Sequence, residues 1–261
     1  MKLITWNINS VRLRLPLLLR LMRERKPDVV CLQETKCPDE FFPHDAIAKA
    51  GYKYQHICGM KSYNGVAILS RLPFDGHGAL NWQGREDCRH IHAGLSNGIE
   101  IHNVYVPAGG DIPDPKANPK FAHKLGFVEE QAAWWKKKRG RTGKILVGDL
   151  NIAPLEHDVW SHRQMLGVVS HTPGEVERLN AMQAAHEWHD ALRHFVPPQE
   201  KLYTWWSYRA QDWEKSNRGR RLDHIWVTPD LRGQLKSMHV MRPARGWTQP
   251  SDHVPVEIDL A

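Results

Sequence analysis

The opening of the chain decides the fold. It reads Leu3-Ile4-Thr5-Trp6-Asn7-Ile8 and, further on, Val29-Val30-Cys31-Leu32-Gln33-Glu34. Both runs are short and rich in isoleucine, valine and leucine, as buried strands are. Between them, Pro16–Lys26 carries four large apolar residues at helical spacing and stops before Pro27. A strand, a helix and a second strand in this order predict at least one crossover between parallel strands.

Further apolar runs of strand length follow along the whole chain, with no linker between them. They lie at Val66–Leu69, Ile99–Val106, Ile145–Val147, Leu222–Val227 and Val254–Ile258. The dipeptide Asn97-Gly98, placed between Ala93–Ser96 and Ile99–Val106, predicts an antiparallel hairpin. These runs indicate a protein built mainly from β-sheets.

Two more helices are expected between the strands. Lys120–Arg139 has large apolar residues at steps of three and four, which places them on one helical face. Glu175–His186 has a weaker helical pattern. Strands that outnumber helices and include a crossover favour mixed sheets covered by helices, an α/β or α+β layered sandwich. We expect a single domain over residues 1–261.

The composition describes a basic globular protein. Of the 261 residues, 41% are apolar and 25% are charged, which excludes a disordered, collagen-like or coiled-coil chain. The formal net charge of +7 predicts attraction to polyanions such as DNA, RNA, heparin or an anionic membrane surface. The sequence has no signal-peptide pattern, no bilayer-spanning run and no metal-finger spacing among its four cysteines. We therefore expect a cytoplasmic protein with no membrane partner.

Polar side chains stand at the ends of several apolar runs. They are Asn7, Glu34, Asp149 and Asn151 after the early runs, and Asp223, Asp252 and His253 at the start of the late runs. If the late strands run antiparallel to the early ones, these groups meet at one rim of the sheets. Each residue alone is also explained as a turn former or backbone cap. Their shared position is what favours a functional site.

The residue types at this rim indicate a particular chemistry. Carboxylates and amides without thiolates are hard oxygen ligands, which suit Mg²⁺ or Mn²⁺ and argue against structural zinc. A histidine next to Asp252 fits a proton carrier or a hydrogen-bond donor to an anionic transition state. Tyr105, at the end of its run, has the simpler interpretation of an aromatic residue packed on the core.

Six sequence blocks carry these residues in a fixed order. They are Thr5-Trp6-Asn7-Ile8-Asn9, Leu32-Gln33-Glu34-Thr35-Lys36, Tyr63-Asn64-Gly65-Val66-Ala67-Ile68-Leu69-Ser70, Gly148-Asp149-Leu150-Asn151-Ile152-Ala153-Pro154, Arg221-Leu222-Asp223-His224-Ile225 and Ser251-Asp252-His253-Val254-Pro255-Val256. Together they resemble bacterial exonuclease III, the Mg²⁺-dependent DNA-repair nuclease related to apurinic/apyrimidinic (abasic-site) endonucleases, from Lys2 to Asp259. The resemblance implies a four-layered α/β sandwich, with two mixed β-sheets packed face to face, helices on the outside and the site at one rim.

The resemblance also implies roles for the rim residues. The metal group is Glu34 as the main Mg²⁺ ligand, Asn7 close by, and Asp252 as a second acidic group. The catalytic group is Asp149, which is oriented by Asn151 and positions or deprotonates the attacking water, with His253, Asp223 and Tyr105 serving the scissile phosphate. Mn²⁺ is expected to substitute for Mg²⁺. Whether the aspartate, the tyrosine or the histidine is the general base stays open.

For the substrate, the resemblance implies five contacts: Lys36, Arg89, Trp205, Arg220 and Leu222. Trp205 and Leu222 correspond to residues that line the pocket for a flipped abasic sugar, and Arg89 to an arginine that contacts the DNA backbone. Lys36 is either a residue at the edge of the site or an ordinary surface lysine. Arg220 replaces a tryptophan that closes this pocket in the animal enzymes.

Other segments have their own expectations. The aromatic and arginine residues of Tyr203–Arg209 and Arg218–Arg221 predict DNA contacts. The basic run Lys136–Arg139 is expected to complement the dipole at the end of its helix. We expect the remaining tryptophans to serve in packing; they include Trp160, Trp188 and Trp247.

The partner implied by the resemblance is double-stranded DNA with abasic sites or 3′ ends, bound by a monomer. The sequence departs from the family at Ala108, where many relatives have an amide, and at Asn9, where animal enzymes have an aspartate. The balance between abasic-site incision, 3′→5′ exonuclease and 3′-phosphatase activity therefore stays open. Two alternatives are a phosphoinositide or phospholipid phosphodiesterase or phosphatase of the same superfamily, and a non-catalytic DNA-binding module.

Overall fold

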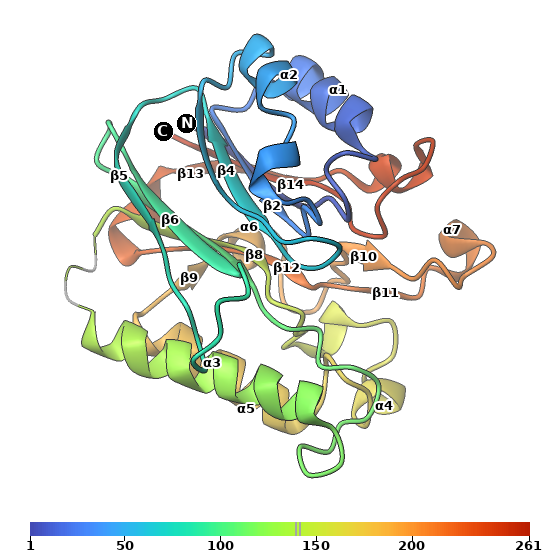
Figure 1. Cartoon of the computed structure of the whole chain (residues 1–261). Helices are drawn as coiled ribbons and strands as arrows, with labels where there is room; N and C mark the ends of the chain where they lie inside the picture. The colour runs from blue at the N-terminus through green and yellow to red at the C-terminus, as the bar shows by residue number, and fades with distance from the viewer. Residues whose placement is uncertain (139, 141) are drawn as a thin grey trace.

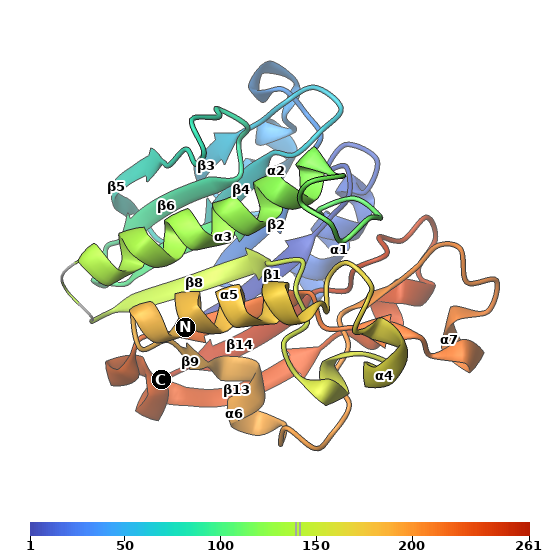
Figure 2. The same ribbon diagram turned by 90° about the horizontal axis from the view of Figure 1, so that it is seen from below.

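Two β-sheets packed face to face form the centre of the molecule, and helices cover their outer faces (Figure 1). The computed structural model describes residues 1–138, 140 and 142–261. Both chain ends lie at the same end of the sheets (Figure 2). The four layers, helix, sheet, sheet and helix, match the expected α/β sandwich.

The first sheet has the strand order β13-β14-β1-β2-β4-β3. Its strands are β1 (Lys2–Asn7), β2 (Val29–Gln33), β3 (Tyr54–Cys58), β4 (Val66–Ser70), β13 (Leu235–Val240) and β14 (Val256–Leu260). Only β1 and β2 are parallel, and the other neighbours are antiparallel. Because parallel neighbours require a crossover, the chain passes through helix α1 (Leu15–Arg25) between them.

The second sheet repeats this pattern with the order β5-β6-β7-β8-β12-β9. Its strands are β5 (Phe74–Ala79), β6 (His90–Leu95), β7 (Glu100–Tyr105), β8 (Lys144–Asp149), β9 (His189–Asp190) and β12 (Asp223–Val227). Here β7 and β8 are the parallel pair, joined through helix α3 (Pro119–Lys137). Each sheet thus has one central parallel pair flanked by antiparallel strands, although the sequence shows no repeat.

The helices divide between the two outer faces (Figure 1). Helices α1 and α2 (His44–Lys49) cover the first sheet, and α3 and α5 (Pro173–Ala185) pack together over the second. The short helices are α4 (His162–Met165), α6 (Ala191–Phe195), α7 (Trp213–Ser216) and the 3₁₀ turns Asp39–Phe41, Glu156–Asp158, Pro229–Gln234 and Arg242–Gly246. Strands β10 (Trp205–Trp206) and β11 (Gly219–Arg220) form a separate two-stranded ribbon that leads to the α7 loop.

Alternation along the strands builds three apolar layers. On β1 and β2, Leu3 and Cys31 face the second sheet, whereas Ile4 and Val30 face the α1 and α2 side. On the second sheet, Leu146 packs instead among residues of α3 and α5, such as Val128. Strands buried on both faces explain why the central runs read as continuous apolar stretches.

All seven apolar runs form strands, and Asn97-Gly98 lies in the hairpin between β6 and β7. The strand ends lie within three residues of the expected positions. The predicted helices are also present, and α3 ends at Lys137; Arg139, the end predicted from the sequence, lies outside the described residues. Strands β3, β5 and β13 were not predicted. They are edge strands with partly exposed polar and glycine residues, so they lack an apolar run.

None of the helices formed by the described residues combines the length and the apolar character that a membrane span requires.

A buried histidine on β7 makes stability depend on pH. His102 is fully buried, with ring nitrogens 2.9 Å from His90 Nε2 and 2.5 Å from a Glu100 carboxylate oxygen. Its ring packs edge-on against Trp135, 4.7 Å between centroids. Burial lowers the pKa of His102 to about 4 although Glu100 acts to raise it. The imidazole is therefore neutral in the folded protein near pH 7.

This gives a prediction for unfolding in denaturant at pH 7 and pH 5. The contribution of a depressed pKa is lost as the pH falls below about 6.5, because the unfolded chain then binds a proton that the folded chain refuses. From the folded pKa of about 4, His102 should cost about 2 kcal/mol of unfolding free energy at pH 5. His102→Gln should remove that part of the pH dependence. Parallel pH profiles for the two proteins would contradict the assignment.

Candidate active site

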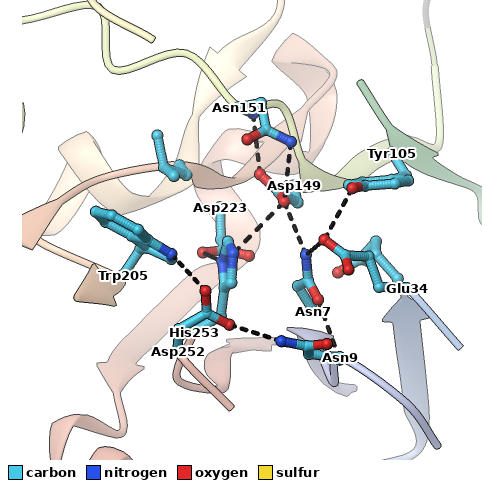
Figure 3. A network of polar contacts seen from close by, with 12 residues as sticks. Asn7, Asn9, Glu34, Tyr105, Asp149, Asn151, Trp205, Asp223, Asp252 and His253 are labelled. Atoms are coloured by element: carbon cyan, nitrogen blue, oxygen red, sulfur yellow. Dashed lines mark hydrogen bonds and ion pairs between the residues drawn. The ribbon is translucent and has the colours of Figure 1, made fainter. Parts of the chain in front are cut away.

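The predicted polar residues meet at one rim of the two sheets (Figure 3). Strands β1, β2, β7 and β8 bring Asn7, Glu34, Tyr105 and Asp149 to the rim at their carboxyl ends. The antiparallel strand β12 starts there, so that Asp223 pairs directly with Asp149 across the ladder. Asp252 and His253 arrive just before β14, which is antiparallel to β1. The expected antiparallel arrangement of the late strands is confirmed.

The side chain of Asn7 connects the two sheets at this rim. Its amide Nδ2 donates to Glu34 Oε1 of the first sheet and to Asp149 Oδ2 of the second, both at 2.9 Å. Its Oδ1 accepts from the backbone N–H of Asn9 at 3.1 Å, and its backbone carbonyl accepts from the Ser251 hydroxyl at 2.7 Å. Asn7 is fully buried, and these three side-chain hydrogen bonds fix the orientation of its amide.

Glu34 lies beside the ammonium group of Lys36. Lys36 Nζ lies 2.7 Å from Glu34 Oε2 and also donates to Asn9 Oδ1 at 2.7 Å. The Tyr105 hydroxyl donates to Glu34 Oε1 at 2.8 Å. Burial acts to raise the pKa of Glu34, but the Lys36 charge and the hydrogen bonds from Asn7, Lys36 and Tyr105 hold it below its usual range. Glu34 is therefore an ionised carboxylate.

Asp149 occupies the floor of the rim. Its Oδ1 accepts from the backbone N–H of Asn151 at 2.9 Å, and its Oδ2 accepts from the Asn151 side-chain amide at 3.1 Å. Burial, with Asp223 nearby, raises the pKa of Asp149 to about 7 against the opposing effect of His253. The preceding Gly148 has φ +139°, and a Cβ there would collide with the Val104 carbonyl, so the close approach of β7 and β8 requires glycine.

His253 lies between two carboxylates. Its Nδ1 is 2.9 Å from Asp223 Oδ2, and its Nε2 is 3.7 Å from Asp149 Oδ2. Burial acts to lower the pKa of His253, but the Asp223 and Asp149 carboxylates raise it to about 10. An imidazolium donates hydrogen bonds from both nitrogens, so Nδ1–H binds Asp223 while Nε2–H faces the rim.

These residues could also hold a metal ion. A carboxylate oxygen of Asp149, one of Asp223 and a ring nitrogen of His253 lie within 4.8 Å of one another. Because the imidazolium of His253 carries a proton on both nitrogens, the oxygen donors of the rim are the groups available to a metal. Asp252 is farther out, where Oδ1 accepts from Asn9 Nδ2 at 3.1 Å and Oδ2 accepts from Trp205 Nε1 at 2.9 Å. The site thus contains four carboxylates and three asparagine amides, a set of hard oxygen donors.

A cleft of about 870 Å³ opens beside the rim. Its lining includes the predicted residues Glu34, Asn151, Trp205, Arg220, Leu222, Asp252 and His253. The Arg220 guanidinium lies over the Trp205 ring, 5.0 Å from its centroid, and donates to Ser170 Oγ at 2.9 Å. The cleft has both an acidic end and a wall of aromatic and cationic groups.

Two predicted substrate contacts are placed differently from the rest. Lys36 belongs to the rim through Glu34. Arg89 lies behind Tyr105, with its guanidinium 4.8 Å from the Tyr105 ring centroid and bonded to Asp87 at 2.5 Å. Its side chain is 12% exposed, so it supports Tyr105 and offers little surface to a ligand.

The aromatic and arginine segments differ in part from expectation. Tyr203, Trp206 and Arg221 are buried, so they do not form the contact surface that the sequence predicted. Trp160 packs against two apolar clusters, as predicted, and in addition lines the cleft, with the Arg218 guanidinium 4.7 Å from its ring centroid. Nothing in the sequence of Arg218–Arg221 distinguishes Arg221, which faces the core, from Arg218 and Arg220, which line the cleft.

Comparisons with known proteins agree with this geometry. The family model for the Endonuclease/Exonuclease/phosphatase family matches residues 4–253. Exodeoxyribonuclease III of Haemophilus influenzae is 29% identical over 278 residues, which cover 98% of each chain. Exodeoxyribonuclease of Bacillus subtilis is 28% identical, over 99% of this chain and 98% of the relative.

Solved structures agree as well. An AP endonuclease from Archaeoglobus fulgidus has a TM-score of 0.92 at 29% identity and covers 100% of this chain and 99% of its own. A 3′ phosphatase from Neisseria, solved with a product DNA hairpin, has a TM-score of 0.90 at 31% identity, with the same coverage.

The fold and the site define a hydrolase of phosphate esters, in which a buried imidazolium and a separate acidic group face one cleft. The chain belongs to the Endonuclease/Exonuclease/phosphatase family. Enzymes of this family depend on metal ions, and the acidic rim offers a place for one.

The buried position of Arg221 predicts a structural role. Its guanidinium bonds both oxygens of Asp158 at 2.8 Å and Asp190 Oδ2 at 2.6 Å. Arg221→Met leaves Asp158 with a weakened set of partners and should lower the unfolding free energy by about 3–5 kcal/mol. The exposed neighbour Arg218 is the control, and Arg218→Met should change it by less than about 0.5 kcal/mol. Urea denaturation measures both, and equal small effects would contradict this role.

Proposed function

We propose that this protein is a DNA-repair nuclease that hydrolyses phosphodiester bonds in double-stranded DNA with abasic sites or 3′ ends. The observation that carries the proposal is the row Asp223–His253–Asp149, which faces Glu34 across the Asn7 amide at the mouth of the cleft. The names of the relatives, which include exodeoxyribonuclease III, AP endonuclease and 3′ phosphatase, support it. We take the chain to act as one catalytic domain and as a monomer.

We propose Mg²⁺ as the cofactor, with Mn²⁺ as a substitute. The donors at the rim are carboxylate and amide oxygens, which these ions prefer over sulfur. The ion pair between Lys36 Nζ and Glu34 Oε2, 2.7 Å apart, supports this proposal, because Glu34 already binds a positive charge. Glu34 would be the main ligand, with Asn7 and Asp252 close to the ion. When bound, the ion would neutralise charge on the phosphate and the leaving oxygen.

The protein's own groups would supply the other parts of the reaction. Asp149 would hold the attacking water and accept its proton, while Asn151 and Asn7 fix the direction of its lone pairs. The His253 imidazolium would donate to a non-bridging phosphate oxygen, and that bond strengthens as charge develops. The Tyr105 hydroxyl, which donates to Glu34 in the structure, would be a second donor to the phosphate. Burial keeps its pKa well above the usual value.

The cleft wall beside the rim would receive the sugar and the DNA backbone. Trp205 and Leu222 provide apolar surface, and the Arg220 guanidinium provides positive charge. A cationic and aromatic wall of this kind fits a nucleic acid, because bases and sugars stack on aromatic rings while arginine binds phosphates. This wall also distinguishes DNA from a phospholipid head group, for which an apolar rim around the cleft would be expected.

The central test compares three duplexes: one with an internal abasic site, one with a recessed 3′-hydroxyl and one with a 3′-phosphate. Wild type should act on at least one of them in Mg²⁺ and on none with a chelator. His253→Ala should lower every activity by roughly 10²–10³-fold, because a transition-state donor is removed. The ratio of the three rates measures the balance of activities.

Two outcomes would overturn the proposal. Cleavage of a phospholipid head group without cleavage of any duplex would identify the lipid-directed alternative. Binding of duplex DNA without turnover, unchanged in Glu34→Ala, would identify a non-catalytic binding module.

A second test concerns the metal directly. Mn²⁺ binding, followed by electron paramagnetic resonance of the free ion, should be at least about 10-fold weaker in Glu34→Gln, since even an outer partner of a metal ligand affects affinity by 10–100-fold. Glu24→Gln is the matched control, because Glu24 is an exposed partner of Arg20 on α1. Equal Mn²⁺ affinity in both variants would remove Glu34 from the metal site.

A further inference from the structure

A buried ion pair lies behind the wall of the cleft, outside the groups that carry the chemistry. Lys124 Nζ of α3 lies 2.5 Å from Glu175 Oε1 of α5, and both side chains are fully buried. The two helices lie side by side on the outer face of the second sheet (Figure 2). Burying two charges is unfavourable unless their remaining donors and acceptors are also used. The other hydrogen bonds of Lys124 and Glu175 therefore show which parts of the backbone the ion pair holds in place.

The Lys124 half binds the backbone next to Asp149. Its Nζ donates to the carbonyl of Asn151 at 2.8 Å and to the carbonyl of Ala108 at 3.3 Å. Asn151 has φ +52°, a left-handed conformation that asparagine adopts more often than other non-glycine residues. Its side chain is the amide that orients Asp149. The ammonium thus holds the backbone carbonyl of the residue that orients the catalytic carboxylate.

The Glu175 half binds the opposite wall. Its two carboxylate oxygens accept from the backbone N–H of Ser170 at 2.9 and 3.0 Å, and Oε2 accepts from the Thr172 hydroxyl at 2.7 Å. Ser170 also has a left-handed backbone, with φ +89°. Its hydroxyl receives the hydrogen bond from Arg220, the guanidinium that lies over Trp205. The carboxylate thus fixes the residue that anchors the cationic wall.

We propose that the Lys124–Glu175 ion pair is a positioning element of the site, which sets the distance between the Asp149 floor and the Arg220 wall. The backbone bond from Ala153 N–H to the Ser170 carbonyl, at 2.8 Å, ties the same two loops together in front of it. Lys124 and Glu175 touch no reacting atom, so both are positioning residues. The inference rests on the proposed nuclease function of the cleft.

The geometry assigns two separate effects to the pair. Loss of the Lys124 bonds frees Asn151, so Asp149 would be less well oriented and kcat would fall. Loss of the Glu175 bonds frees Ser170 and Arg220, so the substrate wall would move and KM would rise. A displacement of about 1 Å in such a site lowers the rate by roughly 100-fold. A merely structural role would reduce the amount of active protein and leave KM unchanged.

The test uses the double variant Lys124→Met/Glu175→Gln in the full chain. It removes both charges together, so neither is left buried alone, and it keeps an amide oxygen for the N–H of Ser170. The control is Glu257→Gln, which weakens a pair between a buried Glu257 and Arg25, 2.5 Å apart, on β14 and α1. Neither of these two residues lines the cleft. Urea denaturation compares the stability of the two variants.

We expect the double variant to lose roughly 100-fold in kcat/KM, with KM raised, while Glu257→Gln keeps the wild-type KM. Lys124→Arg, which retains the charge and several donors, should restore most of the activity relative to Lys124→Met. Amide hydrogen exchange should quicken at residues 150–153 and 169–172 in the double variant and not in the control.

A double variant with wild-type KM and unchanged exchange in these two segments would overturn the inference. The exchange measurement needs no substrate, so it also separates the two hypotheses. If wild type cleaved none of the duplexes, the proposed function would fail, and unchanged protection in the double variant would still count against the ion pair.

Discussion

Four carboxylates in one largely buried rim are the constraint on which the rest of the site depends. Glu34, Asp149, Asp223 and Asp252 would repel one another if each were ionised without a partner. Different groups balance the negative charge of the different carboxylates. Lys36 neutralises Glu34, His253 lies between Asp223 and Asp149, and the Asn7 amide donates to Glu34 and Asp149. Asp149 is the carboxylate whose negative charge is least well balanced, and burial raises its pKa to about 7.

The strand order explains how distant parts of the chain supply these groups. Each sheet has one parallel pair, and the carboxyl ends of both pairs reach the same rim. Antiparallel strands β12 and β14 begin where the parallel strands end, which adds Asp223 and His253. Behind the rim, Gln33 Nε2 of the first sheet bonds Asn103 Oδ1 of the second at 2.7 Å. This buried polar contact fixes the register of the two sheets immediately beneath the site.

The sequence predicted those parts of the site where a polar residue stands next to a run of residues expected to be buried. An acid or amide at the end of an apolar run is unusual enough to notice, so the rim residues could be named before their contacts were known. Residues with an ordinary local explanation could not be placed. Lys124 reads as a polar position of an amphipathic helix, yet it is fully buried against Glu175. Arg221 reads as part of a basic surface, yet it pairs with Asp158, 63 residues earlier. Such pairs depend on through-space contacts that no local pattern encodes.

Trp205 shows how the acidic rim and the cationic wall coexist in one cleft. An indole has a negative face and a positive edge. Its N–H donates to Asp252 at 2.9 Å, while the Arg220 guanidinium lies over its face, 5.0 Å from the centroid. The indole satisfies both charges separately. It thereby leaves Arg220 directed at the cleft and Asp252 at the rim.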